Sequence, residues 1–104
     1  MDIIERIKET VESTPIVLFM KGNPQFPQCG FSAKTVEALK SCETEFSYVD
    51  VLEEPSVREN LPKYSDWPTF PQLFVGGELI GGCDIVLELH EQGELQQITK
   101  AAVS

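Results

Sequence analysis

The spacing of hydrophobic residues changes several times along the chain, and each change predicts a new element. The first segment has helical spacing, with apolar residues at Ile3, Ile4, Ile7 and Val11. Asp2 can cap this helix and Pro15 ends it. Residues 16–20 are all apolar, which predicts a strand buried on both faces. After a loop over residues 21–28, a second helix should begin near Cys29 or Gly30. It should turn inward Ala33, Val36 and Leu39.

The rest of the chain continues the alternation. Residues 46–51 are rich in aromatic and β-branched side chains and predict a second strand. Pro55 suits the first turn of a third helix. Residues 73–75 and 78–80 flank Gly76-Gly77, which predicts a tight hairpin. A fourth helix, stopped near Gly93, and a short final helix follow. The order α-β-α-β-α-β-β-α-α predicts an α/β fold with one four-stranded mixed sheet and helices on both faces.

Composition narrows the possible functions. A chain of 104 residues with a net charge of −9 is expected to form one domain, residues 1–104, and lacks the basic surface that nucleic acid or an anionic membrane would require. The three cysteines show no paired spacing, which favours a reducing compartment and a cytoplasmic location. Five of the eight basic residues fall in the middle of the chain, which would suit a small anion. They are Lys21, Lys34, Lys40, Arg58 and Lys63.

Cys29 is the strongest candidate for chemistry. It follows a buried strand and stands at the start of a helix, where free backbone N–H groups and the helix dipole favour a thiolate and lower its pKa. Lys21 could add to this effect if the loop folds back. Ser32 stands three residues later, where a dithiol enzyme has its second cysteine. A serine cannot form a disulfide, although its hydroxyl can donate a hydrogen bond to a thiolate.

Other residues are given a structural interpretation. Cys42 lies near a helix end and is expected to be a surface or half-buried thiol. His90 has no second histidine beside it and is expected to be solvated rather than a metal ligand. Trp67 is expected to pack or to flank the turn that follows it, with exposure beside a ligand groove as the alternative.

Cys29-Gly30-Phe31-Ser32 resembles the CGFS signature of the monothiol glutaredoxins. Three further motifs agree with that family in order and spacing: Met20-Lys21-Gly22, Trp67-Pro68-Thr69-Phe70-Pro71-Gln72 and Gly81-Gly82-Cys83-Asp84. The resemblance covers nearly the whole chain and is closest to the short, single-domain members. It implies the thioredoxin-like (glutaredoxin) fold.

The resemblance also implies a site for glutathione. Lys21 and Arg58 would hold the glycyl carboxylate. A cis peptide bond before Pro71 would present the Phe70 backbone, next to Thr69, to the cysteinyl part of the tripeptide. The backbone of Cys83 would receive the γ-glutamyl carboxylate, and Asp84 its ammonium group. Asp84 could instead be a helix cap, and the Cys83 thiol is expected to take no part. Phe31 would shield the thiolate or contact a partner, or simply pack.

One cysteine cannot hold a [2Fe–2S] cluster, which takes four thiolates. Two Cys29 thiolates and two glutathiones would complete the set, which predicts a cluster-bridged homodimer; the resemblance implies the same. The predicted function is therefore iron–sulfur cluster assembly, transfer to acceptor proteins and iron homeostasis. The resemblance further implies a BolA-family partner.

Two alternatives stay open. A second glutathione could resolve a Cys29–glutathione mixed disulfide, which would make the protein a thiol–disulfide oxidoreductase that deglutathionylates proteins. The seven-residue loop between Lys21 and Cys29, with Pro24 and Pro27, is longer than in dithiol glutaredoxins, so this activity is expected to be weak or absent. The other alternative is a binding module without thiol chemistry.

Overall fold

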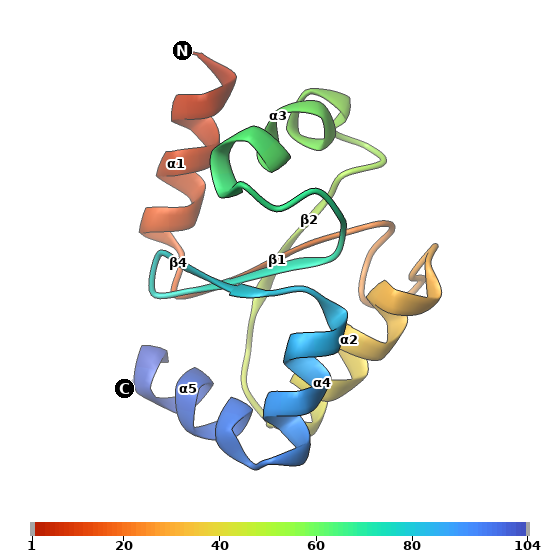
Figure 1. The fold of residues 1–104 in the computed structure, drawn as a ribbon, viewed down its shortest axis with the longest axis vertical. Coiled ribbons are helices and arrows are strands. Elements are labelled where there is room, and N and C mark those ends of the chain that lie inside the picture. The colour runs from red at the N-terminus through yellow and green to blue at the C-terminus, as the bar shows by residue number, and fades with distance from the viewer. Residues whose placement is uncertain (1, 104) are drawn as a thin grey trace.

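The computed structural model describes residues 2–103 and has a mixed sheet as its centre (Figure 1). The strands are β1 (Ile16–Met20), β2 (Ser47–Asp50), β3 (Gln72–Val75) and β4 (Glu78–Gly81). They form a four-stranded sheet in the order β2-β1-β3-β4. β2 runs parallel to β1, whereas β3 is antiparallel to both β1 and β4. The crossover and the hairpin predicted from the sequence are both present.

The helices form a layer on each side of the sheet. They are α1 (Ile3–Ser13), α2 (Gly30–Ser41), α3 (Pro55–Ser65), α4 (Cys83–Glu91) and α5 (Glu94–Val103). α1 and α3 pack together on one face, and α2, α4 and α5 cover the other (Figure 1). The chain therefore has the predicted thioredoxin-like glutaredoxin fold. None of the helices within residues 2–103 is long and apolar enough to cross a membrane.

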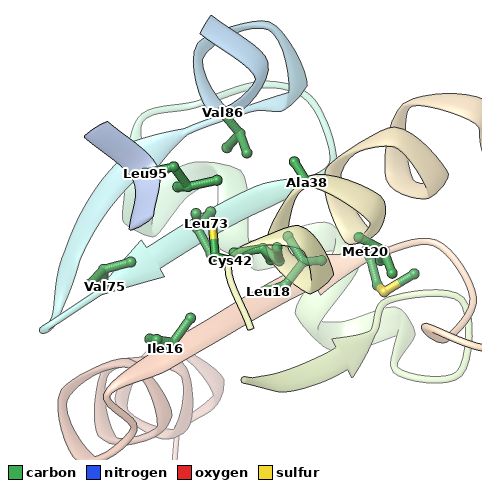
Figure 2. Packing of buried hydrophobic residues seen from close by; sticks show 11 residues of the cluster. Ile16, Leu18, Met20, Ala38, Cys42, Leu73, Val75, Val86 and Leu95 are labelled. Carbon is green, nitrogen blue, oxygen red and sulfur yellow. The ribbon is translucent and has the colours of Figure 1, made fainter. Parts of the chain in front are cut away.

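The core has two halves because β1 is buried on both faces. Alternate residues of a strand point to opposite sides, so Val17 and Phe19 pack with α1 and α3. Leu18 and Met20 pack with the other helices, and Leu18 lies next to Leu73 of β3 (Figure 2). All of β1 is buried, so the start of the loop that follows it is fixed by the core.

Most element boundaries agree with the predicted pattern. Asp2 caps α1 by accepting a hydrogen bond from the Ile4 N–H at 3.2 Å. β2 is one residue shorter at each end than predicted. Within α2, Ala33 is only half-buried, and the fully buried polar residues Ser32 and Thr35 lie on the inner face as well.

The expectation for Cys42 is wrong. Its side chain is 4 % exposed and its sulfur lies among core side chains that include Leu18 and Leu73 (Figure 2). Cys42 is three residues beyond Leu39, so both side chains project from the same face of α2. Burial raises the pKa of the Cys42 thiol, although a hydrogen bond with Thr99 opposes this in part. Cys42 is therefore a core residue.

Candidate functional site

A groove of about 810 Å³ lies where five segments of the chain meet. These segments are the loop after β1, the start of α2, one side of α3, the connection from α3 to β3, and the start of α4. The lining includes all nine residues predicted for the site: Lys21, Cys29, Phe31, Arg58, Thr69, Phe70, Pro71, Cys83 and Asp84. Five more residues complete it: Pro62, Trp67, Pro68, Gly82 and Ile85. Residues far apart in sequence thus form one continuous surface.

Cys29 is half-buried and occupies the N-cap position of α2. Its side chain makes no regular capping hydrogen bond, yet the N–H groups of the next turn interact with the sulfur. The pKa of Cys29 is lowered, chiefly by the Ser32 backbone N–H and then by the Phe31 N–H, with desolvation opposing both. The positive charge of Lys21 and the Ser32 hydroxyl add smaller effects in the same direction. The site therefore favours a thiolate at the groove.

Ser32 links the cysteine to the lysine. Its side chain is fully buried, and its hydroxyl oxygen accepts a hydrogen bond from the Lys21 backbone N–H at 3.2 Å. The Lys21 carbonyl in turn accepts a bond from the Gln28 N–H at 2.9 Å, immediately before Cys29. Position 32 thus faces inward and fixes the strand-to-helix loop, and its hydroxyl, which carries no sulfur, cannot resolve a disulfide at Cys29.

The same loop is held a second time by Asp50, the last residue of β2. One carboxylate oxygen, Oδ1, accepts hydrogen bonds from the backbone N–H groups of Gly22 and Leu52, both at 2.9 Å. Gly22 follows Lys21, and Leu52 begins the turn that leads into α3 and Arg58. Asp50 therefore ties together the two segments that carry the cations of the groove.

The loop between Lys21 and Cys29 has a defined shape. Gly22 has φ +91°, and a Cβ there would lie 2.6 Å from the Phe26 carbonyl oxygen and 2.7 Å from the Gln28 nitrogen. The Asn23 side chain accepts bonds from the backbone N–H groups of Gln25 and Phe26. Phe26 is 72 % exposed at the end of this turn, so the loop displays an aromatic ring to solvent.

The opposite wall of the groove is the connection from α3 to β3. The Phe70–Pro71 peptide bond is cis, as expected. Trp67 is half-buried against Gly82: a Cβ on this glycine would lie 3.2 Å from the indole Nε1 and 3.3 Å from the Pro71 carbonyl oxygen. Both distances are tighter than most Cβ contacts, so a side chain at this position would require the indole or the Pro71 carbonyl to shift by a few tenths of an ångström.

The start of α4 forms the far end of the groove. Gly82 is its N-cap and no side chain caps this end, so Cys83 and Asp84 occupy the first turn. The expectation that Asp84 could be the helix cap is therefore wrong. The Cys83 side chain is buried, whereas Asp84 is exposed. Unpaired backbone N–H groups of a first turn favour a bound carboxylate.

The basic residues do not form one cluster. Lys21 and Arg58 line the groove, whereas Lys40 lines a separate hollow beside β2. Lys34 and Lys63 are exposed and line neither. Of the five basic residues whose positions suggested an anion site, only Lys21 and Arg58 thus lie in the groove. His90 is exposed near the end of α4, as expected.

Comparison with known proteins agrees with this geometry. The Glutaredoxin family model matches residues 16–80. Glutaredoxin 4 of Pasteurella multocida is 55 % identical over 98 residues, which cover 94 % of this chain and 90 % of the relative. Glutaredoxin 4 of Escherichia coli K12 is 57 % identical over 97 residues, or 93 % and 84 % of the two chains. The chain belongs to the glutaredoxin family. The solution structure of reduced apo GrxS14 from poplar has a TM-score of 0.80 at 47 % identity and covers 95 % of this chain and 91 % of that one.

This glutaredoxin is of the monothiol type, because serine occupies the fourth position of its CGFS motif. The predicted site contains nine of the residues that line the groove, but it lacks Pro62 and Ile85 and the residues that hold the groove in shape. Asp50 has no motif around it. Gln72 is fully buried within an otherwise apolar strand, and this exception to the pattern could have marked it. Ser32 was interpreted by its chemistry alone, although its bond to Lys21 gives it a structural role.

Proposed function

We propose that this glutaredoxin binds glutathione in the groove and carries a [2Fe–2S] cluster between two protomers. The main support is Cys29, a half-buried thiol with a lowered pKa on an open groove, with a buried serine in place of a second thiol. A captured sulfur ligand would therefore be retained rather than expelled by the neighbouring residue.

Glutathione fits the chemistry of the groove. A volume of about 810 Å³ lies in the range of small-molecule sites. Lys21 and Arg58 would bind one carboxylate of the tripeptide. The free N–H groups at the start of α4 would bind the other, and the Asp84 carboxylate would accept hydrogen bonds from the ammonium group. The tripeptide's sulfur would then lie beside Cys29.

The donor count favours a shared cluster as cargo. A [2Fe–2S] centre takes four thiolates, and residues 2–103 contain no group of three or more cysteine, histidine or acidic side chains placed to hold a metal ion. Two Cys29 thiolates and two glutathione thiolates would supply all four ligands. Because two of these ligands would be diffusible, the cluster could pass to acceptor proteins, in a role in iron–sulfur assembly and iron homeostasis. A reducing, cytoplasmic location suits such a cargo.

Anaerobic reconstitution tests this proposal. The protein would be mixed with iron, sulfide and glutathione, and visible absorption and molecular size would be measured. We expect a coloured dimer that needs glutathione and is lost in Cys29→Ser. Cys42→Ser is the matched control, because Cys42 lies in the core. A colourless monomer under every condition would contradict the proposal. Addition of a BolA-family protein to the loaded dimer should yield a mixed dimer.

The second candidate is glutathione-dependent thiol–disulfide exchange, which the lowered pKa of Cys29 favours. The thiolate would attack a glutathionylated protein, release the protein thiol and keep glutathione as a mixed disulfide. A second glutathione would then attack that bond. A coupled reduction assay measures this activity directly. Partner binding that survives in Cys29→Ser would instead indicate a binding module.

A further inference from the structure

Gln72 is a buried polar residue that serves the groove without lining it. It is the first residue of β3, has no exposed surface and lies opposite Phe19 of β1. Strand alternation places it on the same face as Phe74, towards α1 and α3. Its neighbours on this face are apolar, and Phe19 and Phe74 make an edge-to-face ring contact. A hydrophobic side chain would suit this position better than an amide.

The side-chain amide of Gln72 donates two hydrogen bonds, both to the segment between α3 and β3. Nε2 donates to the carbonyl oxygen of Trp67 at 3.0 Å and to that of Thr69 at 3.1 Å. These two carbonyls belong to the connection over residues 67–71, and every residue of that connection lines the groove. One side chain that does not itself line the groove therefore holds the wall formed by residues 67–71.

The other end of the amide is left unsatisfied. Oε1 of Gln72 is buried and has no hydrogen-bond partner among residues 2–103. A buried acceptor without a partner destabilises a fold, and a well-packed apolar residue avoids that loss. At this position, the loss of stability from the unpaired Oε1 atom accompanies two hydrogen bonds that hold the wall of the groove.

We infer that Gln72 is a positioning residue for the glutathione site. It holds the Trp67–Thr69 backbone so that the tripeptide meets a wall that is already in place. This inference rests on the proposed function, since it concerns the same ligand. Removal of the donors should weaken glutathione capture and leave the Cys29 thiolate unchanged, because the groups that stabilise the thiolate belong to the start of α2 and the loop after β1, not to the segment that Gln72 holds.

The test measures formation of the Cys29–glutathione mixed disulfide from glutathione disulfide. The Cys29 thiolate attacks one sulfur of the disulfide, the S–S bond breaks, and one glutathione leaves as a thiolate. The equilibrium constant follows from peptide-level mass spectrometry at Cys29 in defined mixtures of reduced and oxidised glutathione. Reaction of Cys29 with an uncharged pyridyl disulfide, measured against pH, reports the thiolate separately.

Gln72→Met keeps the length of the side chain and removes both donors. We expect the equilibrium constant to fall about tenfold, as for a binding loop that loses its preorganisation, with an unchanged pH profile for the pyridyl disulfide. Thr99→Val is the matched control, since Thr99 is also fully buried and bonded to carbonyl oxygens but belongs to α5. It should keep the wild-type constant. A Gln72→Met protein that folds and stays within about twofold of wild type overturns the inference.

Gln72→Glu provides a second test if the methionine variant does not fold. Its carboxylate cannot donate, whereas its protonated form regains one O–H donor. Relative to wild type, its mixed-disulfide constant should recover as the pH falls from about 8 to about 5.5. A constant ratio to wild type over this range also overturns the inference. If the wild-type protein itself forms no mixed disulfide with glutathione, the proposed function fails instead.

Discussion

Asp50 offers a sharp test of how the groove is built, because one carboxylate oxygen holds two backbone N–H groups. Both bonds, to Gly22 and Leu52, measure 2.9 Å. Asp50→Ala removes the acceptor and leaves both N–H groups without it. Asp50→Asn keeps a carbonyl oxygen for the same two donors and removes only the charge.

The expected loss follows from these two bonds. A hydrogen bond to a charged group contributes about 1.5–3 kcal/mol. Because Asp50 is half-buried, water can partly replace its carboxylate as an acceptor. We therefore take the contribution of each bond to stability as about 1–1.5 kcal/mol. Asp50→Ala should therefore lower the free energy of unfolding by about 2–3 kcal/mol, and Asp50→Asn by about 1 kcal/mol. For a chain of this size the alanine variant should lose about 10 °C or more in Tm.

Urea and thermal denaturation would measure these losses. Removal of one negative charge from a chain of net charge −9 relieves some repulsion, which partly hides the effect. Glu53→Ala corrects for this, since it removes the same charge from the exposed turn three residues later and should change stability by less than about 0.5 kcal/mol. If Asp50→Ala matches this control, or if Asp50→Asn is as unstable as Asp50→Ala, the two bonds do not hold the loop.

Three further predictions concern the loop and the thiols. Gly22→Ala should destabilise the protein by about 2 kcal/mol or more in denaturant unfolding, because of its positive φ and the contacts of the new Cβ; Gly30→Ala, which meets no atom within 4 Å, should not. In iodoacetamide labelling against pH, Cys29 should react with a midpoint below that of an ordinary thiol, whereas buried Cys42 stays unlabelled. Lys21→Gln should raise the pH of half-maximal Cys29 labelling only slightly, because the backbone N–H groups lower the Cys29 pKa more than Lys21 does. A labelling midpoint equal to that of an ordinary thiol would show instead that Lys21 has the larger effect.

The lowered pKa of Cys29 also predicts the sign of a stability change. The folded protein favours the thiolate more strongly than the unfolded chain does. This contribution to stability is therefore fully present above the pKa of an ordinary thiol. It is lost as the pH falls through the lower pKa of the folded state.

Hydrophobic spacing, together with the prolines and glycines that separate the segments, was enough to predict the order of elements, because each helix buries an apolar stripe and the central strands are almost entirely apolar. It also located β1 as a strand buried on both faces, since residues 16–20 are uniformly apolar. Cys42 was placed wrongly because its position near a helix end was taken to indicate a surface or half-buried thiol. Its spacing from Leu39 was the better guide, because residues three apart share a helix face.

Most of the residues that line the groove could be predicted from the sequence, whereas the side chains that hold this lining in place could not, and the difference has a physical reason. Motifs contain the residues that face a ligand, so its lining could be identified from short stretches of sequence. Two of the side chains that hold the lining act over long sequence separations: Ser32 bonds to Lys21, 11 positions away, and Asp50 bonds to Gly22, 28 positions away. Gln72 acts locally, on residues three and five positions before it. The two distant pairs become visible only when the sheet brings their segments together.

Three polar side chains share this supporting role, and none of them lines the groove. Ser32 in α2, Asp50 in β2 and Gln72 in β3 each bond to the backbone of a segment that carries lining residues. Each bond ends on a backbone atom, so the lining side chains can change without loss of the support. Conversely, a change in one supporter moves several lining residues together. Binding of glutathione in the groove should therefore be at least as sensitive to these three positions as to any single lining residue that contributes only packing.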